Sequence, residues 1–118
     1  MKIKYFKEYE YSCKCGCGKA LINPESLLKL DKARELAGVS FKLNSAYRCE
    51  KHNKSIGGVP NSAHTRGFAF DIACIDSVKR YKIIDALLRS HFNRIGIYES
   101  FIHVDDDPSK PKNVIWHK

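Results

Sequence analysis

Two histidines and an aspartate are placed in this sequence so that they could bind one metal ion. His64 and Asp71 stand seven positions apart, and His103 lies in a later segment, 101–105, that alternates apolar and polar residues like a strand. Imidazole nitrogens and carboxylate oxygens are ordinary zinc ligands, and three protein ligands leave a fourth coordination position open for water. The seven-residue gap is too long for one helical turn. We therefore expect a loop that carries His64 and turns at Gly67 into a strand carrying Asp71.

The residues around Asp71 indicate that its carboxylate is buried. Asp71 lies within the otherwise apolar run 68–74, and His103 stands between Ile102 and Val104. Burying an unpaired charge is costly, so this carboxylate needs a cation or several hydrogen-bond donors. A structural ion pair between Asp71 and a basic residue is the alternative that these features leave open.

Two long helices and several short strands are predicted to position these residues. Asn23 and Pro24 are typical of a helix start and Gly38 of its end, while Asp76 is the expected cap of a second long helix that ends near His91. One apolar face of that second helix is predicted to contain Val78, Tyr81, Ile84, Leu87 and Leu88. A short helix is expected over 49–56, short strands over 41–47, 68–74, 94–98 and 101–105, and an extended arm or edge strand over 1–17. The pattern predicts an α+β fold with a small antiparallel sheet flanked by two main helices.

The length and composition indicate one globular domain covering residues 1–118. The chain is 43% hydrophobic and 11% aromatic, which is enough apolar surface to bury a core. Its formal charge of +8 implies attraction to an anionic partner. The basic residues are scattered, without the aromatic-interleaved pattern of nucleic-acid binding, so we expect no nucleic-acid partner. No apolar run is long enough for membrane insertion, and we expect a monomer.

Five cysteines occur, three of them at Cys13, Cys15 and Cys17. An odd number of cysteines, in a chain with no apolar secretory segment at its start, favours free thiols over a disulfide framework. The C-x-C-x-C spacing differs from the C-x2-C spacing typical of structural zinc sites. Buried or surface thiols are therefore the preferred interpretation, and a structural metal site is the alternative.

Several motifs together resemble the zinc D-alanyl-D-alanine carboxypeptidase family, especially its short members, which include murein endopeptidases and phage endolysins. Residues 62–71 fit the pattern S-x-H-x-x-G-x-A-x-D, and H-x-D follows at 103–105. Ser45-Ala-Tyr-Arg48 looks like the family's S-G-Y-R segment, and residues 52–59 look like its H-N-x-x-V-G-G segment. The motifs occur in the family's order across most of the chain. The resemblance therefore implies a fold of the Hedgehog and D-Ala-D-Ala-peptidase type.

The resemblance also implies roles for individual residues. It makes His64, Asp71 and His103 the ligands of a zinc cofactor. Arg48 becomes the residue that binds or polarises the substrate, because a guanidinium stays charged and presents a fork to a carboxylate or a developing oxyanion. Ser62 would support the metal site by hydrogen bonding and Trp116 would pack the site wall, and we group both with Arg48 as substrate-binding residues.

The general base is where this sequence departs from the family pattern. Many members have Asp or Glu three residues before the last zinc ligand, and here that position is Ser100. Two other carboxylates are the catalytic candidates. Glu99 could reach the site if its turn swings inward, and Asp105 lies two residues after His103, on the same strand face. Asp105 could act as the base or could orient a ligand from behind.

The resemblance implies a zinc metallopeptidase, either a carboxypeptidase or an endopeptidase, that cleaves stem or cross-link peptides of peptidoglycan in cell-wall lysis. The short chain has few loops to close a cleft, which favours endopeptidase action. Ser100 supports the alternative, a catalytically inactive zinc-containing module that binds the cell wall or serves as a phage structural part. With no signal peptide recognised, we expect the protein to stay in the host cytoplasm and to reach the wall after holin release or tail delivery.

Overall fold

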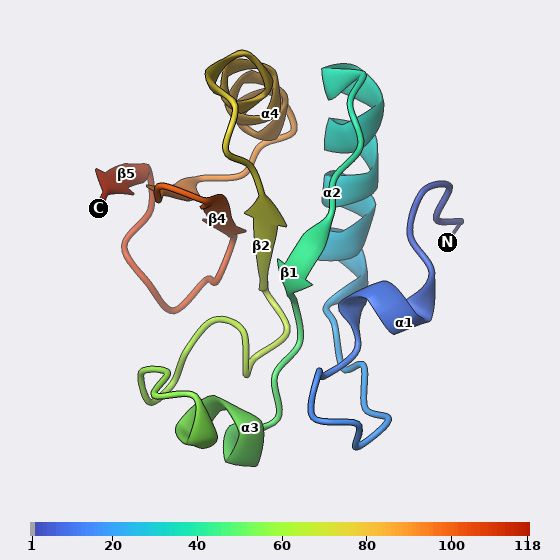
Figure 1. Ribbon diagram of the computed structural model, residues 1–118, viewed down its shortest axis with the longest axis vertical. Coiled ribbons are helices and arrows are strands. Elements are labelled where there is room, and N and C mark those ends of the chain that lie inside the picture. Colours follow the sequence, from blue (N-terminus) through green and yellow to red (C-terminus); the bar gives the residue numbers. More distant parts are fainter. Residues whose placement is uncertain (1) are drawn as a thin grey trace.

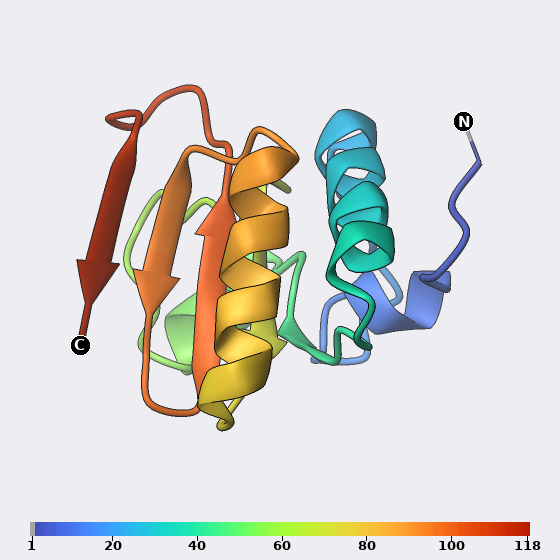
Figure 2. The ribbon, with the colours of Figure 1, turned by 90° about the horizontal axis from the view of Figure 1, so that it is seen from above.

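The computed structural model describes residues 2–118 as an open five-stranded sheet with two long helices on one face (Figure 1). In chain order the elements are α1 (Glu8–Tyr11), α2 (Pro24–Ala37), β1 (Leu43–Ser45), α3 (Glu50–Ser55), β2 (Ala69–Ala73), α4 (Ser77–Arg89), β3 (Arg94–Ile97), β4 (Phe101–Asp105) and β5 (Val114–His117). Figure 2 shows α2 and α4 on the near side of the strands and α3 behind them. The predicted α+β class is confirmed.

The strands are arranged in the order β1-β2-β4-β3-β5. The pairs β1–β2, β2–β4 and β3–β4 are antiparallel, as expected, whereas β5 lies parallel to β3. After β4 the chain crosses through residues 106–113 to the far side of β3 and runs opposite to β4, which makes β5 parallel to β3. The sheet is therefore mixed rather than wholly antiparallel.

Both long helices begin where the sequence predicts. The side chain of Asn23 accepts a hydrogen bond from the Ser26 N–H at 3.0 Å, and that of Asp76 accepts one from the Lys79 N–H at 3.1 Å. Gly38 ends α2 with a left-handed φ of +68°, a conformation that glycine adopts without a steric penalty.

The predicted apolar face of α4 is wrong in part: Leu87 is buried and Ile84 packs against the core, but the other three predicted residues do not. Val78, Tyr81 and Leu88 are exposed, whereas the buried residues of the helix are Ile83, Ala86 and Leu87. The buried set follows the i, i+3, i+4 spacing of one helix face. It was predicted only in part because Ala86 contributes little hydrophobicity, although its small side chain suits close packing.

The core lies between the sheet and the two long helices. Phe70 and Ile72 of β2 and Ile102 and Val104 of β4 are fully buried there, packed with residues of α2 and α4 that include Leu27, Leu30, Ile83 and Leu87. Successive side chains on a strand point to opposite faces. The intervening residues Asp71, His103 and Asp105 therefore lie on the other face of the same two strands.

Of the two alternatives predicted for residues 1–17, an extended arm or an edge strand, the edge strand is wrong for the described residues 2–17. Residues 8–11 form a single helical turn, because the Glu10 side chain accepts a hydrogen bond from the Lys7 N–H at 2.8 Å and favours a helix start. The backbone N–H groups of Lys4 and Tyr5 donate to the buried carboxylate of Asp31, at 2.9 and 2.8 Å, which fixes the segment against α2. Within residues 2–118, no helix combines the length and the apolar composition required to cross a bilayer.

Candidate metal centre

Three side chains converge on the sheet face opposite the core. Asp71 and His103 are directly paired residues of β2 and β4. Asp71 Oδ1 lies 3.2 Å from His64 Nε2 and 3.0 Å from His103 Nδ1. Ligand atoms of all three residues lie within 4.8 Å of one another, a group that could hold one metal ion. The structure thus brings together the three residues that the sequence predicts as ligands.

His64 is delivered by a tight loop before β2. The loop is closed by hydrogen bonds from Phe68 N–H to the Ala63 carbonyl and from Gly67 N–H to the His64 carbonyl, at 3.0 and 3.3 Å. Gly67 has a φ of +83°, and an added Cβ atom would lie 2.3 Å from the Leu21 carbonyl oxygen. A side chain at Gly67 is therefore excluded both by the backbone conformation and by the neighbouring chain. The turn falls at Gly67, as the sequence predicts.

The second nitrogen of each histidine has a hydrogen-bond partner. His64 Nδ1 lies 2.7 Å from the Ala46 carbonyl oxygen, and His103 Nε2 lies 2.6 Å from Asp105 Oδ2. With a metal bound, each contact would hold the imidazole proton on the outer nitrogen and leave the lone pair of the nitrogen that faces Asp71 free for the metal. In the metal-free protein that inner nitrogen can instead carry a proton and donate it to Asp71. Two imidazole nitrogens and a carboxylate oxygen facing one another fit the donor set of a catalytic zinc site.

Asp105 is held in place on both sides of its carboxylate. Its Oδ2 accepts from His103, while its Oδ1 accepts from Arg94 Nε at 2.9 Å and from the Asp107 N–H at 3.1 Å. The residue is 1% exposed. These contacts give Asp105 the geometry of a residue that orients His103, the second of the two roles the sequence leaves open.

The carboxylates and imidazoles of the site shift one another's pKa values. Burial alone would raise the pKa of the Asp71 carboxyl, but hydrogen bonds and charge from His103 and His64 hold it well below its usual range. Burial alone would lower the pKa of His103, but hydrogen bonds to Asp105 and Asp71 raise it. Asp71 is therefore ionised across the neutral range and available to a cation.

The three candidate ligands line a cavity of about 500 Å³. Arg48 lines it too, half-buried, with an Nε that is buried and has no hydrogen-bond partner among residues 2–118. Burial lowers the pKa of the Arg48 guanidinium and the nearby Asp71 carboxylate opposes that shift. A half-buried guanidinium whose Nε is buried and unpartnered, beside the candidate ligands, is arranged to receive an anionic or polarised oxygen.

The other two predicted substrate-binding residues also line this cavity. Ser62 is buried, and its hydroxyl oxygen accepts a hydrogen bond from the His64 N–H at 3.2 Å. The Trp116 ring lies 5.5 Å from the His103 ring, and its Nε1–H donates to the Tyr98 hydroxyl at 3.0 Å. An added Cβ atom at Gly96 would lie 2.5 Å from the Trp116 ring, so the glycine makes room for this wall.

Glu99 does not reach the cavity. Glu99 and Ser100 are exposed in the turn between β3 and β4, and neither is among the residues that line the cavity. Among residues 2–118, the cavity-lining carboxylates are Asp71 and Asp105. The identity of the general base stays a prediction.

Three polar residues of the cavity lining were not predicted from the sequence as site residues: Arg94, Tyr98 and Lys110. Strand alternation places Arg94 on the same face of β3 as Gly96, and the register pairs Arg94 with Asp105. Reading the segment 94–98 with a period of two would have placed Arg94 and Tyr98 on the site face. No comparable pattern marks Lys110, which lies in the connection between β4 and β5.

An α+β domain with a His-Asp-His donor set on the open face of its sheet has the architecture of a metal-dependent hydrolase. The sequence profile of the family Peptidase M15 matches residues 4–105. The chain therefore belongs to the Peptidase M15 family of zinc D-Ala-D-Ala carboxypeptidases, and it is a metallopeptidase of that family. A comparison with curated proteins gave no match.

Proposed function

We propose that this protein is a zinc peptidase that hydrolyses the stem or cross-link peptides of peptidoglycan. The observation that carries the proposal is the convergence of His64, Asp71 and His103 at a cavity that also presents the guanidinium of Arg48. Membership of the Peptidase M15 family supports peptide hydrolysis.

Zinc is the metal that best suits these residues. Two neutral imidazoles and one carboxylate form a borderline-soft donor set with an open position, a set typical of catalytic zinc. When bound, zinc would act as a Lewis acid that makes water nucleophilic near neutral pH and polarises the scissile carbonyl.

Residues of the chain itself would orient the metal ligands and bind the substrate. The Ala46 carbonyl and the Asp105 carboxylate hold the two imidazoles in the required tautomers. Arg48 is placed to bind the substrate carboxylate or to stabilise negative charge on the carbonyl oxygen. Arg94 and Lys110 also line the cavity, and the cationic lining suits the carboxylate-bearing peptides of peptidoglycan.

We propose that the protein acts as an endopeptidase at the bacterial cell wall. The segments 56–62 and 106–113, which border the cavity, are short, and this supports endopeptidase action on a polymer. The positive charge of +8 supports accumulation on an anionic cell wall. We propose that the protein is made in the host cytoplasm and reaches the wall after holin release or tail delivery.

A second candidate function rests on the position of Glu99. Because this carboxylate is exposed in a turn and Asp105 is fully engaged, the cavity presents no free carboxylate besides Asp71 among the described residues. This arrangement supports a zinc-containing module that binds the wall without cleaving it. The peptidase proposal requires the turn 98–100 to bring Glu99 inward, or another group to accept the proton.

The decisive experiment treats isolated peptidoglycan with the zinc-loaded protein and analyses the soluble products by mass spectrometry. We expect peptides or D-alanine to be released, release to stop with a chelator and to return with zinc, and His64→Ala to be inactive. The product masses would identify the cleaved bond. Wall binding without release, by protein that still contains zinc, would favour the binding module. Neither release nor binding would reject both proposals.

A further inference from the structure

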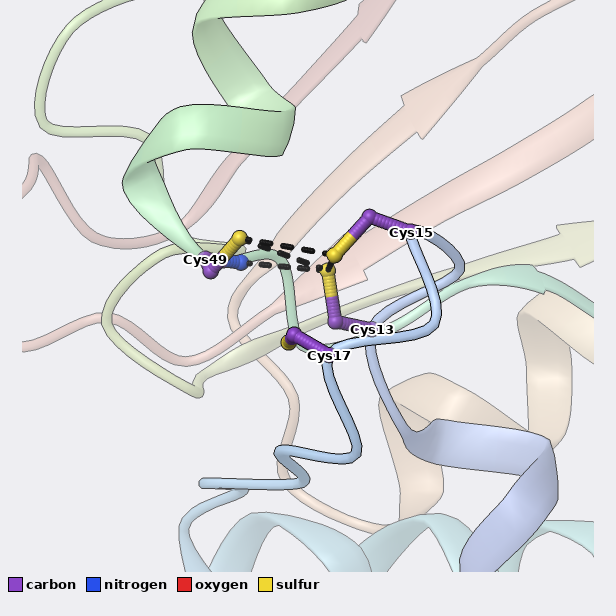
Figure 3. A group of neighbouring side chains, drawn as sticks. All are labelled: Cys13, Cys15, Cys17 and Cys49. Atoms are coloured by element: carbon purple, nitrogen blue, oxygen red, sulfur yellow. Dashed lines mark hydrogen bonds between the residues drawn. The ribbon is translucent and has the colours of Figure 1, made fainter.

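A second group of potential metal ligands lies apart from the cavity. Cys13, Cys15 and Cys17 come from the loop after α1, and Cys49 immediately precedes α3 (Figure 3). The four sulfur atoms lie within 4.8 Å of one another. Cys49 is separated from the other three by more than thirty positions of sequence, so only the fold brings the four thiols together.

The distances among the sulfur atoms of Cys13, Cys15 and Cys49 match metal coordination rather than disulfide bonding. Cys13 Sγ lies 3.4 Å from Cys15 Sγ and 3.7 Å from Cys49 Sγ, and Cys15 Sγ lies 3.7 Å from Cys49 Sγ. A disulfide brings two sulfur atoms to about 2.05 Å. Four sulfurs placed tetrahedrally at about 2.3 Å from zinc lie about 3.8 Å from one another. All five cysteines of the protein are free thiols.

Backbone N–H groups point at two of the sulfur atoms. Cys13 Sγ accepts from the Cys49 N–H, and Cys49 Sγ accepts from the His52 N–H, both at 3.4 Å. Such hydrogen bonds stabilise thiolates, the form of cysteine that binds metals.

The loop that presents three of the thiols is closed by its own backbone. The Cys13 N–H donates to the Lys19 carbonyl at 2.8 Å. Gly16 and Gly18, at φ of +85° and +81°, alternate with the last cysteines and turn the chain so that it doubles back. The loop therefore gathers its thiols by backbone geometry, without help from apolar packing of Cys15 and Cys17, which are exposed.

We propose that Cys13, Cys15, Cys17 and Cys49 bind a zinc ion as a closed, structural tetrathiolate site. Four thiolate ligands leave no position for water, so the role is to join chain segments rather than to catalyse. Lys51 lines the same cavity as Cys15, Cys17 and Cys49, so that a positive charge lies near the net negative charge that four thiolates and one zinc ion would carry.

Cys49 links the proposed zinc site to the cavity. Cys49 directly follows Arg48, and the Arg48 N–H donates to the His64 carbonyl at 3.2 Å. Zinc at the four thiols would fix residue 49 to the loop 13–17 and so hold Arg48 and the His64 loop in register. The second metal is therefore a support for the wall of the first site.

The first test uses a protein that cannot bind metal at the cavity. The wild-type chain is expected to contain two zinc ions, and the double variant His64→Ala/His103→Ala one. X-ray absorption at the zinc edge of the double variant should show sulfur neighbours alone, at about 2.3 Å. Absence of zinc from the folded double variant, or a shell of nitrogen and oxygen, would overturn the proposal. This readout does not depend on peptidase activity, so failure of the proposed function would leave it intact.

The second test replaces one sulfur by oxygen. Cys49→Ser should lose one zinc ion per chain and gain sensitivity to proteolysis in the loop 13–19. The matched control is Cys74→Ser, because Cys74 is a buried thiol outside the cluster and its variant should retain both ions. Equal zinc content in the two variants would contradict the proposal. If Cys49→Ser does not fold, the X-ray absorption measurement on the double histidine variant decides alone. A count of free thiols in denatured, chelator-treated wild type tests the remaining alternative: fewer than five would reveal a disulfide and contradict the proposal.

Discussion

His103 and Asp105 stand two positions apart on β4 and share a hydrogen bond of 2.6 Å between Nε2 and Oδ2. The other oxygen of Asp105 accepts from Arg94 Nε and from the Asp107 N–H. This arrangement fixes the ring of His103 so that its Nδ1 faces Asp71. A carboxylate behind a metal-binding histidine makes the imidazole a better ligand and holds its tautomer.

From this relationship we expect Asp105→Asn to weaken zinc binding at the His-Asp-His site by about 10- to 100-fold. The amide can still accept one hydrogen bond but carries no charge to hold the proton on His103. Competition with a chromophoric chelator measures the affinity. Glu99→Gln is the comparison, because its exposed side chain does not contact the site, and it should bind zinc like the wild type. If Asp105→Asn instead keeps its zinc affinity and loses all turnover, Asp105 is the base.

Arg48→Ala should keep its zinc and lose activity. The guanidinium lines the cavity with a buried, unpartnered Nε, and removing one such charge-stabilising donor costs about 10²- to 10³-fold in turnover. Steady-state hydrolysis of a peptidoglycan peptide and zinc analysis of the same sample provide the two readouts. Arg89→Ala, a change at an exposed arginine of α4, is the matched control. Wild-type activity in Arg48→Ala would exclude Arg48 from the mechanism.

Gly67→Ala should destabilise the protein more than Gly38→Ala does. Both glycines have positive φ, but an added Cβ atom meets nothing within 4 Å at Gly38 and would lie 2.3 Å from the Leu21 carbonyl oxygen at Gly67. We expect a loss of about 1 kcal/mol in the free energy of unfolding at Gly38 and about 3 kcal/mol at Gly67, where overpacking adds to the backbone strain. Urea denaturation measures both. Equal losses would show that the loop can shift to accept a side chain.

Zinc affinity at the His-Asp-His site should fall as the pH decreases. In the metal-free protein the pKa of His103 is raised above 6.5 by Asp105 and Asp71, against the effect of burial. A proton therefore competes with zinc at pH values at which an ordinary histidine is already neutral. As the pH decreases, the zinc affinity should begin to fall before the pH reaches 6.5, the ordinary pKa of histidine. The same raised pKa stabilises the metal-free fold below the unfolded value, and that contribution is lost as the pH rises through the folded value. Zinc titrations at several pH values test the first effect, and constant affinity across the neutral range would contradict it.

The placement of Asp71 and His103 side by side could be predicted from the sequence because both residues follow the alternation of a strand. Asp71 and His103 are polar residues within apolar strands, and the alternation of those strands requires the polar side chains to share the face opposite the core. Gly67 marks the turn, and Asn23 and Asp76 mark the helix starts. Each of these features depends on residues close together in the sequence.

What the sequence could not predict depends on distant contacts. Cys49 joins the other three thiols only because the β1–α3 segment packs against the loop after α1. The engagement of Asp105 depends on Arg94 from the neighbouring strand. The buried face of α4 was predicted only in part because two apolar stripes compete on this helix, and only contact with the sheet selects the one containing Ala86.

Side chains of β2 and β4 alternate between the core and the cavity, so substitutions at neighbouring positions should affect either folding or chemistry. Phe70, Ile72, Ile102 and Val104 face the helices, whereas Asp71, His103 and Asp105 face the cavity. Neighbouring positions of one strand therefore experience different selection: one set constrains folding yield and the other constrains chemistry. New substrate preferences could arise at the cavity-facing positions and at Tyr98 or Trp116 while the packed layer beneath them stays unchanged. A saturation library scored separately for soluble expression and for turnover would show tolerance that alternates with a period of two residues.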